Sequence, residues 1–502
     1  MKNKAIILLT IILCISFSSC DKFLDVNPKN EVINDDMFAN QEGIENALYG
    51  LYGSLRQNQL YGEYLTFSVT EVLAGNLDAP IHGGSYIYFG TYEYNNSGAK
   101  NIITSIWSKA YEVIGHCNNI IENLDKIDGS EYPLFNKYKG EAYGIRAFLH
   151  FDMLRLFAPH IESHGSEQGI PYSDSYSFKH PEFYTVSEVY DKIIADLKMA
   201  QSLLEDDMNL MSYPRVDVTT LEENFDKGRQ LHFNYYAATA MLARVYWTKG
   251  DLVNASAEAY KIINSETFPL STKDQIKGLI AGNLSEKESI WGLYSTDFYE
   301  VTSYRLATNS SSSSFGPYDP KSGGQYLQPW EDIYNQYLGD QAGNDFRMDW
   351  IGYADEENTA NTLAPQCIKL LDYVRFNGGN SASTRGLLEG ISLIRVPEMY
   401  YIAAEAALES GNIAEATNLI NQVLNSRGLT NLENRDPVIV PDLDFLYNER
   451  HKELFCEGQR WFDMKKKNMD IISNATYSTI PASNEVYVLP IPEEEFEYRN
   501  DN

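Results

Sequence analysis

The chain has 502 residues, with 70 acidic against 40 basic side chains and a formal net charge of −30. Such an acidic surface repels phosphate backbones, which argues against nucleic acid as a partner and favours neutral over anionic glycans as ligands. Five cysteines spread over this length do not make a disulfide-stapled scaffold.

Residues 1–19 have the three parts of an export signal. Lys2 and Lys4 form a short basic end, residues 5–17 are almost all apolar, and Ser18 and Ser19 are small. A helix of the apolar stretch rises about 20 Å, whereas the hydrocarbon core of a membrane is about 30 Å thick. We therefore expect the segment to be cleaved rather than to span the membrane.

Cys20 stands at the expected cleavage point, which resembles the lipoprotein box of bacterial export signals. In that box the thiol receives a diacylglycerol and becomes the first mature residue. Two or more acyl chains hold a soluble domain on a bilayer, where one chain would not. Residues 20–40 are polar and are predicted to be a tether behind this lipid anchor. Plain cleavage, with Cys20 an ordinary thiol, is the alternative.

Helical periodicity dominates residues 41–264. Apolar residues at three- and four-residue steps predict helices over 107–124, 142–157 and 185–204, the last with Thr185 or Ser187 as its N-cap. A tyrosine-rich loop over 76–101 interrupts this part of the chain.

Two predicted helix pairs resemble each other in sequence. The stretches "ARVYWTKGDLVNASAEAYKII" and "AEAALESGNIAEATNLINQVL" align without gaps, with Gly250 on Gly411. Small residues let paired helices approach closely, and the glycine turns the chain between them. The pattern is that of tetratricopeptide repeats. Between the pairs, residues 265–396 form a loop-rich insertion, and long irregular segments on a rigid scaffold often carry binding residues. Helical patterning returns over 397–502.

The common catalytic and metal motifs are missing. There is no HExxH, phosphate-binding Gly-Lys-Ser loop or Gly-x-Ser-x-Gly elbow. His160 and His164 are four residues apart, but Pro159 and Gly165 make the helical face that a metal pair needs doubtful. We therefore expect no metal, no cofactor and no enzymatic activity.

The densest motif is "NERHKELFCEGQRWFDMKK" near the C-terminus. On one continuous helix Arg450 would meet Glu453 and Glu457, while Glu457 would meet Arg460 and Trp461. We interpret this as a half-buried ion network clamped by an aromatic ring, with a structural rather than a catalytic role.

Seven segments in order carry a resemblance to a known family: "CDKFLDVNP", "WSKAYEVIGHCNNIIENL", "YKGEAYGIRAFLHFDMLRLFAPHI", "GIPY", "IRVPEMYYIAAEAALESGNIAEATNLINQVLNSRG", "ERHKELFCEGQRWFDMKK" and "YVLPIPEEEF". From residue 20 to about 496 the chain closely resembles the SusD/RagB family of Bacteroidota surface lipoproteins. The resemblance implies a mostly α fold of four irregular tetratricopeptide-type helix pairs with a loop-rich variable lobe. It also implies a nutrient-binding lid, lipid-anchored at the surface of the outer membrane, on a SusC-type TonB-dependent transporter.

The resemblance and the residue types together suggest where a ligand binds. Sugars stack their C–H faces on aromatic rings and offer hydroxyls to amides and arginines. Tyr86 and Tyr88 flank Ile87 and would point the same way on an extended strand. The candidates are Tyr86, Tyr88, Tyr92, Asn95 and Asn96 in the loop, and Tyr304, Arg305, Tyr326 and Trp330 in the insertion. Trp107 and Trp291 are assigned to the core.

Two other functions stay open. A tetratricopeptide-type adaptor would bind peptide in a concave groove, and a glycoside hydrolase on a helical scaffold would release products from a polysaccharide. The aromatic-bearing insertions argue against the first, and the missing motifs argue against the second.

Overall fold

The computed structural model describes residues 37–78, 84–211, 213, 225–272, 284–285, 287–307, 316–317, 334, 341, 344–353, 365–367, 369–372, 375, 378–381, 389–473, 478–497 and 499. Cys20, Tyr326 and Trp330, the export signal and most of the tether lie outside the described residues. The chain divides into two units, Met1–Ala47 and Leu48–Asn502, and the second contains nearly all of the described residues.

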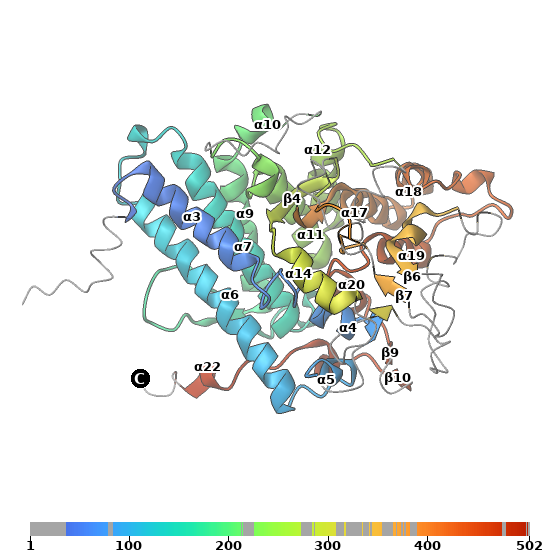
Figure 1. Cartoon of the computed structure of the whole chain (residues 1–502), viewed down its shortest axis with the longest axis horizontal. Helices are drawn as coiled ribbons and strands as arrows, with labels where there is room; N and C mark the ends of the chain where they lie inside the picture. Colours follow the sequence, from blue (N-terminus) through green and yellow to red (C-terminus); the bar gives the residue numbers. More distant parts are fainter. Residues whose placement is uncertain are drawn as a thin grey trace, which may run out of the picture. The chain divides into compact units, whose positions relative to one another are not determined.

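The described residues are mostly helical, as the sequence predicts (Figure 1). The helices are α3 Gln41–Leu55, α4 Val69–Leu73, α5 Ile87–Gly90, α6 Ser97–Leu124, α7 Phe135–Phe157, α8 Ile161–His164, α9 Val186–Leu203, α10 Asp207–Leu210, α11 Tyr235–Lys249, α12 Leu252–Ile263, α14 Phe298–Thr302, α17 Val396–Glu409, α18 Ile413–Ser426, α19 Leu443–Glu453, α20 Arg460–Lys466, α21 Asn484–Tyr487 and α22 Glu494–Glu497. The strands are β1 Leu77–Asp78, β2 Gln168–Pro171, β3 Phe183–Thr185, β4 Ser289–Tyr294, β5 Gly316–Pro317, β6 Ile351–Tyr353, β7 Pro365–Cys367, β8 Gly390–Arg395, β9 Ile471–Ser473 and β10 Ser478–Ile480.

The three long helices predicted from periodicity are α6, α7 and α9, which pack as neighbours in Figure 1. α9 begins with a capping box: the Thr185 hydroxyl accepts from the Glu188 backbone N–H at 3.3 Å, and the Glu188 carboxylate accepts from the Thr185 N–H at 2.8 Å. The two exchanged bonds satisfy donors that a helix start leaves unpaired, which confirms Thr185 as the N-cap.

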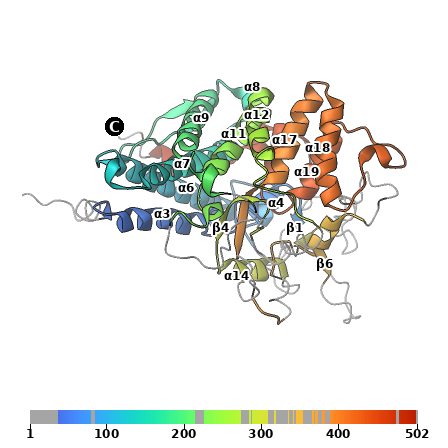
Figure 2. The same ribbon diagram turned by 90° about the horizontal axis from the view of Figure 1, so that it is seen from above.

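The two repeat-like pairs form as predicted. α11 turns into α12 at Gly250, with φ +84°, and α17 turns into α18 at Gly411, with φ +77°. These values lie in the left-handed region that favours glycine. The small residues Ala243 and Ala404 are fully buried in the pairs. α9, α11, α12, α17 and α18 pack one against the next, and Figure 2 shows this succession.

All the strands described form two-stranded antiparallel ribbons. The longest joins β4 to β8, with Trp291 opposite Ile394. This ribbon joins a strand inside the first part of the loop-rich insertion to a strand at the insertion's end. Trp291 is fully buried, as predicted, and the centroid of its ring lies 4.9 Å from the ring centroids of Phe148 and Phe233. Trp107 is buried too. The predicted domain boundaries stay predictions.

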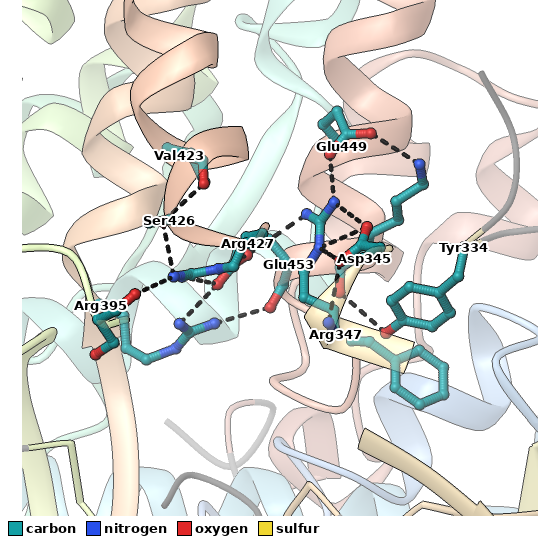
Figure 3. Close-up of polar contacts among 12 residues, drawn as sticks. Tyr334, Asp345, Arg347, Arg395, Val423, Ser426, Arg427, Glu449 and Glu453 are labelled. Atoms are coloured by element: carbon teal, nitrogen blue, oxygen red, sulfur yellow. Dashed lines mark hydrogen bonds and ion pairs between the residues drawn. The ribbon is translucent and has the colours of Figure 1, made fainter. Parts of the chain in front are cut away.

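A buried carboxylate, Glu453, gathers three arginines around it (Figure 3). It accepts from Arg395 Nη1 at 2.8 Å, from Arg427 Nη2 at 2.7 Å and from Arg427 Nε at 2.9 Å, and Arg347 Nη1 lies 3.5 Å away. Burial alone would raise the pKa of Glu453, but Arg427 and Arg395 outweigh it and hold the pKa well below its usual range.

The surrounding charges balance one for one. We call the whole set the Glu453 cluster: its anions are Glu288, Asp345, Glu449, Glu453 and Glu457, and its cations are Arg347, Lys369, Arg395, Arg427 and Lys452. Glu288, like Glu453, pairs with two arginines: Arg395 at 2.9 Å and Arg427 at 3.0 Å. The members come from three places in the insertion, at Glu288, at Asp345 and Arg347, and at Lys369, and also from the end of β8, the end of α18, and α19 with the connection after it. The cluster therefore ties six stretches of chain into one core.

The predicted pairing along a single helix was wrong. α19 ends at Glu453, and Cys456 and Gly458 adopt positive φ values of +60° and +71° before α20 begins at Arg460. These left-handed residues stop the helix, so residues on the two sides of the turn do not share one helical face.

The residues of the predicted network consequently find other partners. Arg450 pairs with Asp463 at 3.0 Å and lies over the Trp247 ring at 4.4 Å. Glu457 pairs with Arg395 at 2.5 Å. Trp461 stacks on Tyr92, with the two ring centroids 6.2 Å apart, instead of covering an ion pair.

Replacing Glu453 by Gln tests the cluster. The variant leaves three buried arginines facing a neutral amide, and removing one partner of a buried ion pair costs about 3–5 kcal/mol of unfolding free energy. The measurement is urea unfolding of wild type, E453Q and the control E409Q, which changes an exposed glutamate at the end of α17. An E453Q chain as stable as E409Q would contradict a structural role for the cluster.

A second buried group, His150 in α7, is held neutral mainly by its burial. Its Nδ1–H donates to the Arg146 carbonyl at 2.9 Å, and its Nε2 accepts from the Ser173 backbone N–H at 3.0 Å. The ring stacks on Tyr172 at 3.9 Å. Burial, with help from the charges of Arg146 and Lys192, lowers the pKa of His150 to about 3.

Acid should therefore destabilise the protein through His150. Between pH 6.5 and 3 the unfolded chain binds a proton at this histidine that the folded chain refuses, so the unfolding free energy falls as the pH falls through this window. The contribution is about 5 kcal/mol at most. Gln has both a donor and an acceptor but does not titrate, so H150Q should flatten the profile, whereas H116Q, at an exposed histidine, should not. Equal slopes for wild type and H150Q would refute this.

Candidate ligand-binding site

Three segments far apart in the sequence meet around Arg305. Its Nε lies 2.9 Å from Glu63 Oε1, and its Nη2 donates to the Tyr86 hydroxyl at 3.4 Å. Tyr86 in turn donates to Glu63 Oε1 at 2.5 Å. The guanidinium also lies over the rings of Tyr86 and Tyr304, 5.2 Å from each centroid. We call Glu63, Tyr64, Tyr86, Tyr304 and Arg305 the Tyr86 cluster.

The cluster is layered from the inside out. Glu63 and Tyr86 are buried, the side chain of Arg305 is 21% exposed, and Tyr304 is 50% exposed. Burial and the charge of Glu63 raise the pKa of Tyr86, so its hydroxyl stays protonated and keeps donating to the carboxylate. The buried pair thus holds the guanidinium beside an aromatic ring that is half exposed.

The predicted extended strand at Tyr86 and Tyr88 was wrong. Tyr86 immediately precedes α5 and its carbonyl accepts from the Phe89 N–H at 3.0 Å, while Tyr88 lies inside the helix. Phe89 is fully buried, which draws this short segment into a helical turn. Residues two apart on a helix do not share a face. Tyr86 therefore points inward, and Tyr88 is half-buried.

Of the other loop candidates, Tyr92 and Asn96 make contacts within the fold and Asn95 is exposed to solvent. Tyr92 has φ +58°, donates its hydroxyl to the Leu73 carbonyl at 2.9 Å and stacks on Trp461. Asn96 is the N-cap of α6, with its Oδ1 accepting from the Gly98 N–H at 2.9 Å. Asn95 is exposed. Of this loop, only Tyr86 belongs to the Tyr86 cluster.

A polar cavity of about 460 Å³ opens beside the cluster, and it was missed from the sequence. Its lining residues are Gly53, Arg56, Gln57, Asn58, Gln59, Gly62, Ser295, Asp297, Phe298 and Val301. Gly62 directly precedes Glu63, and α14 runs from Phe298 toward Tyr304, so cavity and cluster share two segments of chain. The run "RQNQ" over 56–59 was the available signal, since amides and a guanidinium suit hydroxyl-bearing ligands.

A second cavity, also of about 460 Å³, lies between α12 and the α17–α18 pair. Tyr400, Asn418 and Gln422 line it, and Tyr260 donates to Glu415 at 2.5 Å across its edge. The repeat-like helices and the first residues of the insertion, Glu266, Phe268 and Pro269, line this hollow together.

Neither a metal centre nor a membrane span emerges from the described part of the chain. No three His, Cys, Asp or Glu side chains there come together as a metal ion would need. None of the helices in the same residues combines the length and apolar character of a membrane-spanning segment.

Comparison with known proteins shows which family the chain resembles. Residues 22–247 match a SusD-like family model described as "Starch-binding associating with outer membrane", and residues 341–501 match the model of the SusD family. The SusD-like protein P2 of Formosa agariphila is 26% identical over 98% of this chain and 97% of its own length. SusD-like protein P38 of the same organism is 22% identical over 93% of this chain and 92% of its own.

Solved structures have the same fold. A SusD superfamily protein from Bacteroides thetaiotaomicron superimposes with a TM-score of 0.71 at 22% identity, over 91% of this chain and 97% of that one. A SusD-like carbohydrate binding protein from Bacteroides vulgatus gives a TM-score of 0.69 at 17% identity, over 91% and 96%. Family models over most of the chain and relatives along nearly its whole length confirm the resemblance seen in the sequence: the chain belongs to the SusD/RagB family, whose members are binding proteins rather than enzymes.

Proposed function

We propose that this protein is a surface-exposed lipoprotein of the outer membrane that captures an oligosaccharide or polysaccharide and passes it to a SusC-type TonB-dependent transporter. The observation that carries the proposal is the half-exposed Tyr304 ring beside an arginine that is fixed from below by Glu63 and Tyr86. The family description of starch binding at the outer membrane and the carbohydrate-binding relative support it.

The Tyr86 cluster has the chemistry that sugar recognition needs. A sugar ring presents C–H groups that pack on the face of Tyr304, and its hydroxyls accept from guanidinium N–H groups. Because Arg305 already pairs with a buried carboxylate, it loses little side-chain entropy when a ligand binds. The amides of Gln57, Asn58 and Gln59 in the neighbouring cavity extend the polar surface for further sugar units.

The anchor suits a protein that hands on its ligand. A lipid on Cys20 holds the chain at the membrane, and the tether over residues 20–40 leaves the folded domain room to open and close over a transporter. The net charge of −30 favours neutral glycans, because an anionic polymer would be repelled at long range.

Ligand binding can be tested with purified chain lacking residues 1–19 and carrying Cys20→Ser. In affinity electrophoresis a panel of neutral polysaccharides should include one that retards wild type. Y304A and R305A should each weaken binding about 3- to 10-fold, the worth of one aromatic or guanidinium contact. Y176A removes an equally exposed tyrosine elsewhere and serves as the control. Retardation by no polysaccharide, or equal losses in Y304A and Y176A, would contradict the proposal.

In the peptide-binding alternative, the ligand would bind in the second cavity. Its amide side chains Asn418 and Gln422 suit the backbone of an extended peptide. If that alternative holds, N418A and Q422A lower affinity for a peptide library while Y304A leaves it unchanged. The glycan proposal expects the reverse pattern.

Cys20 should decide membrane attachment. Wild type grown with radiolabelled palmitate should incorporate the label and partition into the detergent phase, whereas C20A should be unlabelled and water-soluble. C14A, which changes a cysteine inside the apolar stretch of the signal, should behave as wild type. Wild-type protein that carries no lipid would refute the anchor.

A further inference from the structure

Two buried cysteines meet beneath the loop-rich insertion. The sulfurs of Cys367 and Cys456 are 3.1 Å apart, and both residues are fully buried. A disulfide has an S–S distance of about 2.05 Å, so a shift of about 1 Å would bring the two sulfurs to bonding distance. Cys117 is buried in α6, next to Arg146 and Asp196.

The surrounding structure holds the two cysteines in this position. Cys367 is in β7, opposite Ile351 of β6, and Cys456 has a left-handed backbone with φ +60° that residues other than glycine rarely adopt. Lys369, two residues after Cys367, donates to the carbonyls of Glu453 and Phe455 at 2.8 Å each. The chain beside one cysteine is thus fastened to the chain beside the other.

We infer that Cys367 and Cys456 form a disulfide bond in the mature protein, where the other cysteine of the folded domain, Cys117, stays a thiol. The inference rests on the proposed export, because disulfides form and persist in oxidising compartments. In the reaction the two thiols give up two protons and two electrons, and one S–S bond forms between them. The oxidant is another disulfide, carried by a small molecule or a protein, and its own S–S bond breaks to leave two thiols.

Burial favours formation of the bond before the fold is complete. It raises the pKa of the Cys456 thiol, and the neighbouring Cys367 raises it further. Since the thiolate is the nucleophile in disulfide exchange, the folded and reduced pair reacts slowly. Oxidation during folding is the productive route, and the finished bond is then shielded from reductants.

The bond would fix the part of the insertion that supports the candidate ligand residues. Besides pairing with β6, β7 packs against β5 and against the π-helical turn Ser303–Ala307, which carries Tyr304 and Arg305. A link from Cys367 to Cys456, 89 residues along the chain, connects this layer to the turn between α19 and α20, next to the Glu453 cluster. It also restricts the unfolded chain over that loop, which stabilises the folded state.

The test is the state of the thiols in protein recovered from outer membranes. The sample is denatured without reductant, alkylated with iodoacetamide and digested. The expected result is a linked peptide pair that contains Cys367 and Cys456, with alkylation at Cys117 alone, and alkylation at all three after reduction. C117S should keep the link. Alkylation of both Cys367 and Cys456 before reduction overturns the inference.

A second measurement keeps the test independent of the proposed function. C117S refolded with oxidised glutathione should melt several degrees higher than the same protein after reduction, and C367S should show no such difference. Equal melting temperatures for oxidised and reduced C117S, with both cysteines alkylated, overturn the disulfide wherever the protein is located. If glycan binding and lipid labelling persist in that sample, the proposed function stands without it.

Discussion

Glu453 is the point on which the structure depends. Three arginines converge on this one buried carboxylate, and they come from the insertion, from the end of β8 and from the end of α18. A buried charge is costly unless its partners are complete, so the cluster forms only when all these stretches are in place. One of them is the β4–β8 ribbon, in which Ser289, next to Glu288, is paired with Arg395.

A buried carboxylate with complete partners also organises the Tyr86 cluster near the surface. Glu63 and Tyr86 are buried and satisfied by each other and by Arg305, which leaves Tyr304 as the exposed part of the arrangement. A rigid aromatic face next to a fixed guanidinium favours capture of a ligand without demanding any bond chemistry. The carboxylates at the two clusters are engaged in ion pairs, so they hold structure rather than act as acids or bases.

The long helices were predictable from the sequence, but the short elements around Tyr86 and after Glu453 and the long-range partners were not. Periodicity predicted α6, α7 and α9, and Gly250 and Gly411 marked the turns of both repeat-like pairs because only a left-handed residue closes them. The helix assumed through Glu453 was wrong because Cys456 and Gly458 break it. The ion-pair partners of Glu453 are Arg347, Arg395 and Arg427. They cannot be predicted from helical spacing, which relates only residues three or four apart. The Tyr86 cluster joins positions more than two hundred residues apart for the same reason.

The central claim is that this protein binds a glycan and leaves it intact. The most direct measurement is to incubate the purified mature chain with the polysaccharide that retards it, to determine the affinity by calorimetry, and to assay the recovered polymer for new reducing ends. We expect saturable binding and a polymer of unchanged length. Release of reducing ends by the chain alone, or a lack of binding to any glycan while a peptide binds at the second cavity, would contradict the claim.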